Sequence, residues 1–249
     1  MIFHFFDANI LANQQAEKLA DQREAHTGNP QKIGTYGVIK GASQFVGASI
    51  KREPMALEAL GYEMEVLVLY LTSLGLGSCW LGGTFDREGF AEAMDIGGDW
   101  LLPAITPYGY GAQKMHLKEN LMRRLVGAEK RKPWEQLFFC SNFDTPLTKQ
   151  LAGDLAFPLE MVRLGPSASN KQPWRVLLKD DVLHFFEDKS PGYSAVFSYD
   201  IQRIDIGIAA AHFELSARER GIAGQFEIDA EVELELPDHY EYTFSWRRR

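Results

Sequence analysis

The stretch that decides the fold is residues 166–174, which read Pro-Ser-Ala-Ser-Asn-Lys-Gln-Pro-Trp. Pro166 and Ser167 favour a turn whose backbone polar groups are left free. Asn170 and Gln172 each offer both hydrogen-bond donors and acceptors, and the tryptophan that follows can pack beneath a planar ligand. This mixture suits a heteroaromatic ligand with a polar edge. Composition alone favours a plainer interpretation, a capped turn between a helix and a strand.

A second pattern is an internal repeat on either side of this segment, in which two stretches of the chain resemble each other. Gly61 and Gly75 recur 146 residues later as Gly207 and Gly221, with matched apolar positions between them. A glycine inside a helix costs about 1 kcal/mol relative to alanine, so it usually has a packing reason. Two helices that cross closely at these glycines would supply one. The repeat predicts a divergent tandem duplication, with one copy in each half.

Local signals predict the elements around these segments. Pro54 suits the first turn of a helix, and Asp86 is a plausible N-cap. We expect helices at 56–74, 87–94, 134–140 and 204–220, and strands within 33–49 and at 101–109, 175–178, 182–187 and 225–228.

Composition excludes several classes of protein. The chain has 249 residues, of which 45% are apolar and 24% charged, as in a soluble globular protein. The net charge of -8 argues against a general nucleic-acid-binding role. The longest apolar stretch, around 66–76, is too short to span a bilayer, and the N-terminus has no basic signal-peptide region. The two cysteines, Cys79 and Cys140, fit a reducing compartment, so we expect a cytoplasmic protein without membrane partners.

Common catalytic motifs are missing from the sequence. It contains no GxxxxGK[ST] phosphate-binding loop and no GxSxG nucleophile elbow. Its six histidines have neither HExxH nor HxxxH spacing. We therefore expect no metal site.

Three segments carry a family resemblance. The segment 166–174 resembles the PSxxNxQPW signature of the FMN-dependent nitroreductase family, and GLGSCWLGGTF at 75–85 is similar to its GLGxxWLG segment. KRKPW at 130–134 resembles the basic turn that precedes a short helix in that family. In ordinary members the PSxxNxQPW segment comes first, whereas here it follows GLGxxWLG by about a hundred residues. That order is similar to the tandem, single-chain branch, in which two subunit-like halves form a pseudo-dimer.

The resemblance implies an α+β fold of the nitroreductase type. Two divergent subunit-like halves, residues 1–140 and 141–249, would form an intramolecular pseudo-dimer with the two long helices at its centre. Fusion already supplies the dimer contact, so we expect a monomer. Each half keeps only part of the family's cofactor segments, so we expect one composite site and one FMN per chain.

The resemblance also implies roles for particular residues. The backbone amides around Leu81, Gly82 and Gly83 would approach flavin N5 and O4. The residues expected to reach the cofactor from the other half are Pro166, Ser167, Ser169, Asn170 and Gln172. Lys130 and Arg131 are candidates for the FMN phosphate, and a solvated basic turn is an equally weighted alternative. The motifs imply no protein acid or base as a catalytic residue.

The function implied is that of an oxidoreductase, in which hydride passes from NAD(P)H through FMN to a nitroaromatic, a quinone or a similar small acceptor. A non-catalytic flavin-binding protein needs the same cofactor contacts and is the first alternative. The second alternative is a pseudo-enzyme that has lost FMN. It stays open because the family's Arg-Arg-Ser-x-Arg segment, which grips the FMN phosphate, has no counterpart in the sequence.

Overall fold

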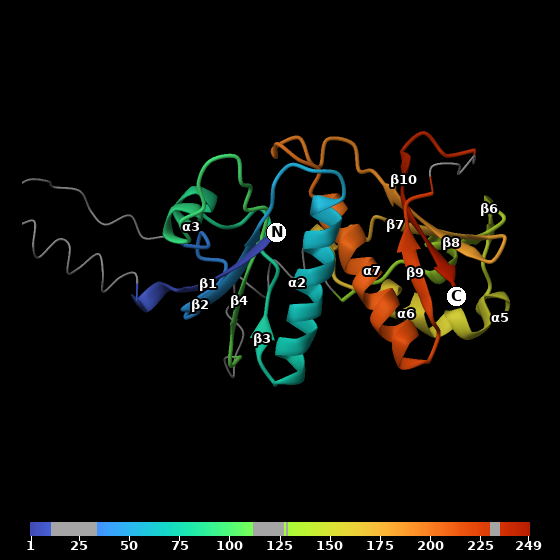
Figure 1. Ribbon diagram of the computed structural model, residues 1–249, viewed down its shortest axis with the longest axis horizontal. Coiled ribbons are helices and arrows are strands. Elements are labelled where there is room, and N and C mark those ends of the chain that lie inside the picture. The colour runs from blue at the N-terminus through green and yellow to red at the C-terminus, as the bar shows by residue number, and fades with distance from the viewer. Residues whose placement is uncertain (11–33, 112–126, 128, 230–234) are drawn as a thin grey trace, which may run out of the picture. The chain divides into compact units, whose positions relative to one another are not determined.

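The computed structural model describes residues 1–10, 34–111, 127, 129–229 and 235–249. It combines helices with largely antiparallel sheets, so the predicted α+β class is confirmed (Figure 1). The chain forms two compact units, residues 1–56 with 67–125 and residues 57–66 with 126–249. The first half of helix α2 (Ala56–Ser73) therefore groups with the second unit.

Four strands make the sheet of the first unit, among the residues described there. They pair antiparallel in the order β1-β2-β4-β3 and comprise β1 (Ile2–Asp7), β2 (Gln44–Ser49), β3 (Gly77–Ser78) and β4 (Ile105–Gly109). Helix α3 (Arg87–Ala93) begins after Asp86, whose carboxylate accepts the N–H of Gly89 at 3.1 Å. The predicted N-cap is confirmed.

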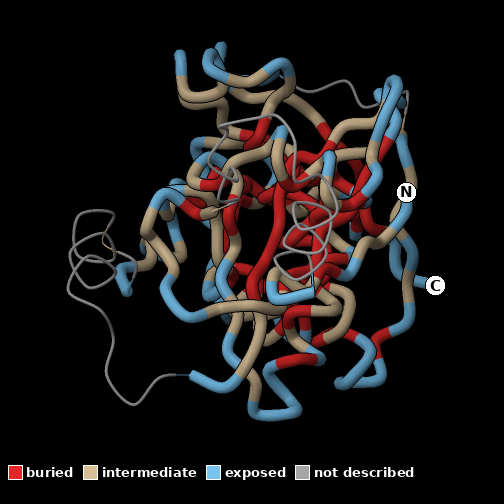
Figure 2. Tube along the Cα trace, turned by 90° about the vertical axis from the view of Figure 1, so that its left-hand side faces the viewer, coloured by how far each residue is buried: buried red, intermediate tan, exposed pale blue. Residues whose placement is uncertain are grey.

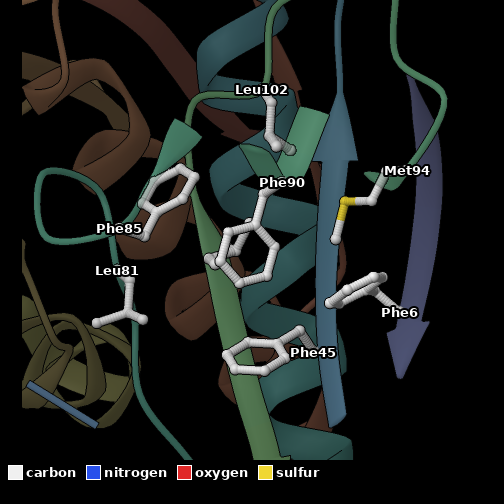
Figure 3. Packing of buried hydrophobic residues seen from close by; sticks show 8 residues of the cluster. Phe6, Phe45, Leu81, Phe85, Phe90, Met94 and Leu102 are labelled. Carbon is white, nitrogen blue, oxygen red and sulfur yellow. The ribbon is translucent and has the colours of Figure 1, made fainter. Parts of the chain in front are cut away.

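An aromatic cluster holds the segment after β3 against this sheet (Figure 3). The ring of Phe90, from α3, meets those of Phe6, Phe45 and Phe85 edge-on, with centroids 5.5, 5.0 and 5.8 Å apart. Such pairs add about 0.5–1.5 kcal/mol each beyond the burial of their area. Leu81 and Phe85 belong to the same cluster. Both ends of the predicted cofactor loop at residues 82 and 83 are therefore anchored in the core.

The second unit contains a longer sheet in the order β6-β5-β7-β8-β10-β9. Its strands are β5 (Phe138–Cys140), β6 (Asn142–Pro146), β7 (Trp174–Lys179), β8 (Val182–Asp188), β9 (Gly224–Glu227) and β10 (Tyr240–Arg248). The strands predicted at 175–178 and 182–187 are confirmed as β7 and β8, which pair antiparallel as a hairpin whose turn places Asp180 and Asp181 at φ 50° and 60°. Two short helices, α5 (Lys149–Ala152) and α6 (Ala156–Leu164), lie between β6 and β7 along the chain.

The helix predicted at 134–140 is wrong. A single 3-10 turn covers 134–136, and β5 follows it, running parallel to β7. Phe138 and Phe139 are 0% and 8% exposed in this strand. Pairing with β7 and burial of these two side chains thus outweigh the helical signal of the local sequence.

The two units share one strand topology. In each, an antiparallel hairpin leads into a helix, which leads to an edge strand and a return strand. The order β1-β2-β4-β3 in the first matches β7-β8-β10-β9 in the second, and every pair in both sets is antiparallel.

The two long helices match residue for residue in their bounds. Helix α7 (Gln202–Glu219) begins and ends 146 residues after α2. Each helix is followed by a glycine in the left-handed region, Gly75 at φ 76° and Gly221 at φ 70°. The same backbone bond closes both ends, since Leu76 N donates to the fifth residue before it at 3.0 Å and Ile222 N does so at 2.9 Å.

The helix-internal glycines have the packing reason that the sequence predicts. A Cβ atom on Gly61 would lie 2.0 Å from the backbone oxygen of Ile204, and one on Gly207 would lie 1.9 Å from that of Glu58. Ile204 stands 146 residues after Glu58, as Gly207 does after Gly61. The contact is therefore reciprocal, as in a symmetric dimer interface. All four residues lie within the second compact unit.

Charged side chains also join the two helices. Arg203 Nη1, on α7, donates to the carboxylate of Glu58, on α2, at 3.0 Å, and its Nε lies 2.8 Å from the carboxylate of Glu187 on β8. Further along the crossing, His212 Nε2 lies 2.9 Å from Glu65 Oε1, and Glu65 is 1% exposed. Burying carboxylates without partners would be costly, so these pairs constrain how the helices can pack.

Helix α7 is buried on nearly all sides, as expected of a helix inside a core rather than on a surface. The buried positions lie mainly in strands and helices and the exposed ones mainly in loops. Figure 2 marks buried positions in red and exposed ones in pale blue along the chain. None of the helices formed by the described residues combines the length and apolar character that crossing a membrane requires.

The helix crossing generates a stability prediction. Gly207→Ala should lower the free energy of unfolding by about 1–3 kcal/mol or more, because a methyl group meets a backbone oxygen that cannot move away alone. In an uncrowded helix the same change would stabilise by about 1 kcal/mol. Urea unfolding followed by circular dichroism measures the difference.

Gly97→Ala is the matched control, since a Cβ there meets nothing within 4 Å. It should leave the unfolding midpoint nearly unchanged. Equal stability of Gly207→Ala and the wild type would show that the helices do not cross as closely as described.

Candidate functional site

The loop at residues 166–172 connects α6 to β7 in an unusual conformation. Ser169, Asn170 and Gln172 have φ values of 48°, 54° and 48°, in the left-handed region that side chains rarely adopt. Such residues cost of order 1–3 kcal/mol each and persist only where the surroundings determine them. Hydrogen bonds from neighbouring segments hold the loop in this conformation.

The side chain of Asn170 joins this loop to the basic turn. Its Nδ2 donates to the backbone oxygens of Gly127 at 2.7 Å and Lys130 at 2.9 Å. Its Oδ1 accepts from Arg131 Nη1 at 3.4 Å. Two segments forty residues apart, predicted separately, are therefore in direct contact.

Gln172 makes a second connection between the loop and the turn. It is 3% exposed, and its Oε1 accepts the backbone N–H of Lys132 at 2.7 Å. Its Nε2 donates to Asn170 O and Oδ1, both at 3.1 Å, and its own N–H reaches Ser167 Oγ at 2.8 Å. The hydroxyl of Tyr193 donates to Ser169 Oγ at 2.8 Å. The polar side chains of the signature thus build the loop itself.

Arg131 is bonded to the end of a helix. Its Nε and Nη2 donate to the backbone oxygen of Leu164, the last residue of α6, at 3.1 and 3.0 Å. A guanidinium in this place satisfies a helix C-terminal carbonyl. Lys130 is exposed beside it. The expectation that both residues bind a phosphate stays a prediction.

Lys132 is a site residue that the sequence analysis does not single out. Burial first, and then the charges of Arg175 and Lys171, lower its pKa to about 8. Its Nζ lies 3.4 Å from the backbone oxygen of Gln172, within the loop. A lysine held near other cations is stabilised when an anion binds there. The signal available in the sequence was its place in the run KRKP.

The second predicted cofactor segment, in the first unit, is held by Arg87. Its guanidinium donates to the backbone oxygens of Gly82, Leu102 and Pro103. The N–H of Leu81 donates to Ile105 O at 2.9 Å, so this amide is already used. The approach of the backbone around Leu81, Gly82 and Gly83 to a flavin stays a prediction.

Several other candidates have plainer roles. Trp174 is 0% exposed, so it is a core aromatic rather than a platform for a ligand. The described residues contain no group of histidines, cysteines and carboxylates that could hold a metal ion. A cavity of about 240 Å³ at the end of α7 is lined by residues that include Glu214, Arg218 and Trp246. It shares no residue with the loop or the turn, so it is separate from the candidate site.

The arrangement in the second unit is suited to an anionic ligand with polar groups. It offers a rigid, hydrogen-bonded loop beside a turn rich in cations. Rigid placement matters because a loop fixed before binding loses less conformational entropy when the ligand arrives.

Comparison with known proteins identifies the family. The family profile described as "Putative TM nitroreductase" matches residues 10–217. The crystal structure of a putative nitroreductase from Thermotoga maritima superposes with a TM-score of 0.53 and 21% identity, over 92% of this chain and 82% of that chain. At that identity the likeness concerns the fold. A search of curated proteins finds no match.

The fold therefore resembles that of the Thermotoga protein, and the family profile spans well over half of the sequence. The chain belongs to the family described as "Putative TM nitroreductase".

Proposed function

We propose that the chain is an FMN-dependent oxidoreductase that passes hydride from NAD(P)H to a nitroaromatic, a quinone or a similar small acceptor. The observation that carries this proposal is the hydrogen-bonded pairing of loop 166–172 with the turn at 130–132. Family membership supports the oxidoreductase class. The residues that make the pairing are those of the flavin signature.

The residues present fit FMN. Lys132 is repelled by Arg175 and Lys171 and attracted by Asp188 in the free chain, and the dianionic phosphate of FMN would add to the attraction. Lys130, two residues before Lys132, adds an exposed ammonium group. When bound, FMN supplies the hydride-transfer chemistry. The chain's part is to hold the phosphate at the turn and to orient the flavin edge along Ser167 and Asn170.

The proposal includes a tandem origin. Residues 1–140 and 141–249 would be diverged copies that form an intramolecular pseudo-dimer, active as a monomer. The shared strand order, the matched helix bounds and the reciprocal glycine contact support it. One FMN per chain would then take contacts from the Gly82 loop of one half and the Asn170 loop of the other.

One observation favours a second candidate, a flavin-binding protein without turnover or a pseudo-enzyme. The side chains of Asn170 and Gln172 already have partners within the protein. They would then serve the fold even if no cofactor bound. Cofactor retention and turnover separate the three cases.

Reconstitution tests the proposed function directly. After incubation with FMN and desalting, the chain should retain one FMN per chain by absorbance. The loaded protein should oxidise NADH or NADPH when a quinone or a nitroaromatic is added. Retained flavin without turnover supports the non-catalytic candidate, and a colourless protein supports the pseudo-enzyme.

Variants in the two loops test the composite site. Asn170→Ala and Gly82→Val should each weaken FMN binding about tenfold or more, the equivalent of 1.4 kcal/mol. Fluorescence quenching of FMN measures the dissociation constant. Asn142→Ala, which removes an exposed asparagine from β6, is the control and should bind as the wild type does. An effect of only one loop would contradict the shared site.

The pH dependence of binding tests Lys132. Its pKa is lowered in the free protein, so its charge is present below about pH 8 and is lost above it. The phosphate charge of FMN is nearly constant from pH 7 to 9, because its second pKa is about 6. Affinity should therefore fall several-fold between pH 7 and pH 9.

Lys132→Gln should bind FMN about tenfold more weakly at pH 7, since a charge-assisted contact is worth about 1.5–3 kcal/mol. It should also show a smaller fall at pH 9. Lys149→Gln removes the same charge from an exposed lysine in the second unit and is the control. A wild-type pH profile in Lys132→Gln would exclude this lysine from the phosphate site.

A further inference from the structure

A buried carboxylate lies directly behind the loop. Asp205, in the first turn of α7, is 2% exposed, and its Oδ1 accepts the backbone N–H of Ala168 at 2.9 Å. Its Oδ2 is buried and has no hydrogen-bond partner among the described residues. Ala168 is the first residue of the turn that leads into the left-handed residues Ser169 and Asn170.

The helix crossing places Asp205 there. The preceding residue, Ile204, supplies the backbone oxygen that closes over Gly61, and Gly207 meets α2 two residues later. The carboxylate therefore cannot shift along the helix without opening that contact. The hydrogen bond between Asp205 and the Ala168 N–H therefore fixes the start of the loop relative to α7.

Burying the Asp205 carboxylate lowers the stability of the fold, and filling the space does not require a charged group. Burial raises the pKa of Asp205 to about 8, with the Ala168 bond opposing the rise and Asp200 adding to it. An apolar residue would fill the space without that cost, but it would leave the Ala168 N–H without its acceptor. Groups that cost stability and are still present tend to serve function.

We infer that Asp205 is a positioning residue, which holds loop 166–172 from behind in the conformation that binds the cofactor. The role in cofactor binding rests on the proposed function, whereas the hold on the loop does not. Asp205 acts through Ala168 and is not itself required to touch the ligand.

Other titratable groups near Asp205 bear on its test. Asp200, on the turn before α7, and Tyr193, on the loop at 190–200, interact with it electrostatically. From α2, Glu58 is paired with Arg203. On β8, burial raises the pKa of Glu187 to about 8, so Glu187 titrates in the same range. Glu187 is present in the wild type and in every Asp205 variant, so its contribution to the pH dependence cancels when their profiles are compared.

Amide hydrogen exchange tests the hold on the loop. Asp205→Ala leaves the Ala168 N–H without its acceptor, so exchange across 166–172 should speed up at least tenfold, whereas exchange in β7 should stay as in the wild type. Asp205→Asn keeps an acceptor and should restore slow exchange. Glu219→Gln, at the other end of α7, is the control. Unchanged exchange in Asp205→Ala overturns the inference.

The pH dependence of unfolding gives a second readout, which covers an Asp205→Ala that fails to fold. The pKa of Asp205 is higher folded than unfolded, so the contribution of Asp205 to wild-type stability should fall as pH rises from about 4 to about 8. Asp205→Asn lacks this proton, so its unfolding midpoint should rise relative to the wild type from pH 5 to pH 8. Parallel profiles would overturn the inference.

Binding of FMN then separates this inference from the proposed function. If the wild type binds FMN, Asp205→Ala should bind at least tenfold more weakly and Asp205→Asn within about twofold of the wild type. Equal binding by Asp205→Ala and the wild type overturns the positioning role. If the wild type binds no FMN but loop exchange responds as expected, the proposed function fails and the hold on the loop stands.

Discussion

The structure depends on two helices that touch where neither has a side chain. At Gly61 and Gly207 the backbone oxygen of the opposite helix occupies the place of a Cβ atom. Only glycine permits this approach, and it is used twice because the contact is reciprocal. The Arg203–Glu58 ion pair and the His212–Glu65 hydrogen bond lie along the same crossing, so the helices are fixed in rotation as well as in distance.

That constraint reaches the candidate site through adjacent residues. Ile204 makes the close contact, and Asp205 beside it bonds the first residue of the loop turn. The left-handed residues of the loop would relax if their bonds were lost, because each is strained by itself. A repeat that sets how two helices pack is thus coupled, through one carboxylate, to the conformation of loop 166–172.

Much of the fold can be predicted from the sequence where signals are local. Asp86 as an N-cap, the β7–β8 hairpin and the bounds of α7 follow from residues near one another. The 134–140 segment could not be predicted, because its strand depends on parallel pairing with β7, about forty residues away. Lys132 and Asp205 were missed for the same reason, since their partners in the loop lie 40 and 37 residues distant.

The site also shows why its signature contains amides rather than charges. Asn170 and Gln172 each need a donor and an acceptor at once, one to bond the turn and one to bond the loop. A carboxylate offers no donor when ionised, and a lysine offers no acceptor. The amides therefore shape the loop, which leaves recognition of an anion to backbone groups and to the neighbouring cations. A motif interpreted from the sequence as ligand-binding is therefore mainly architectural, and the proposed cofactor site would depend on the shape that the motif maintains.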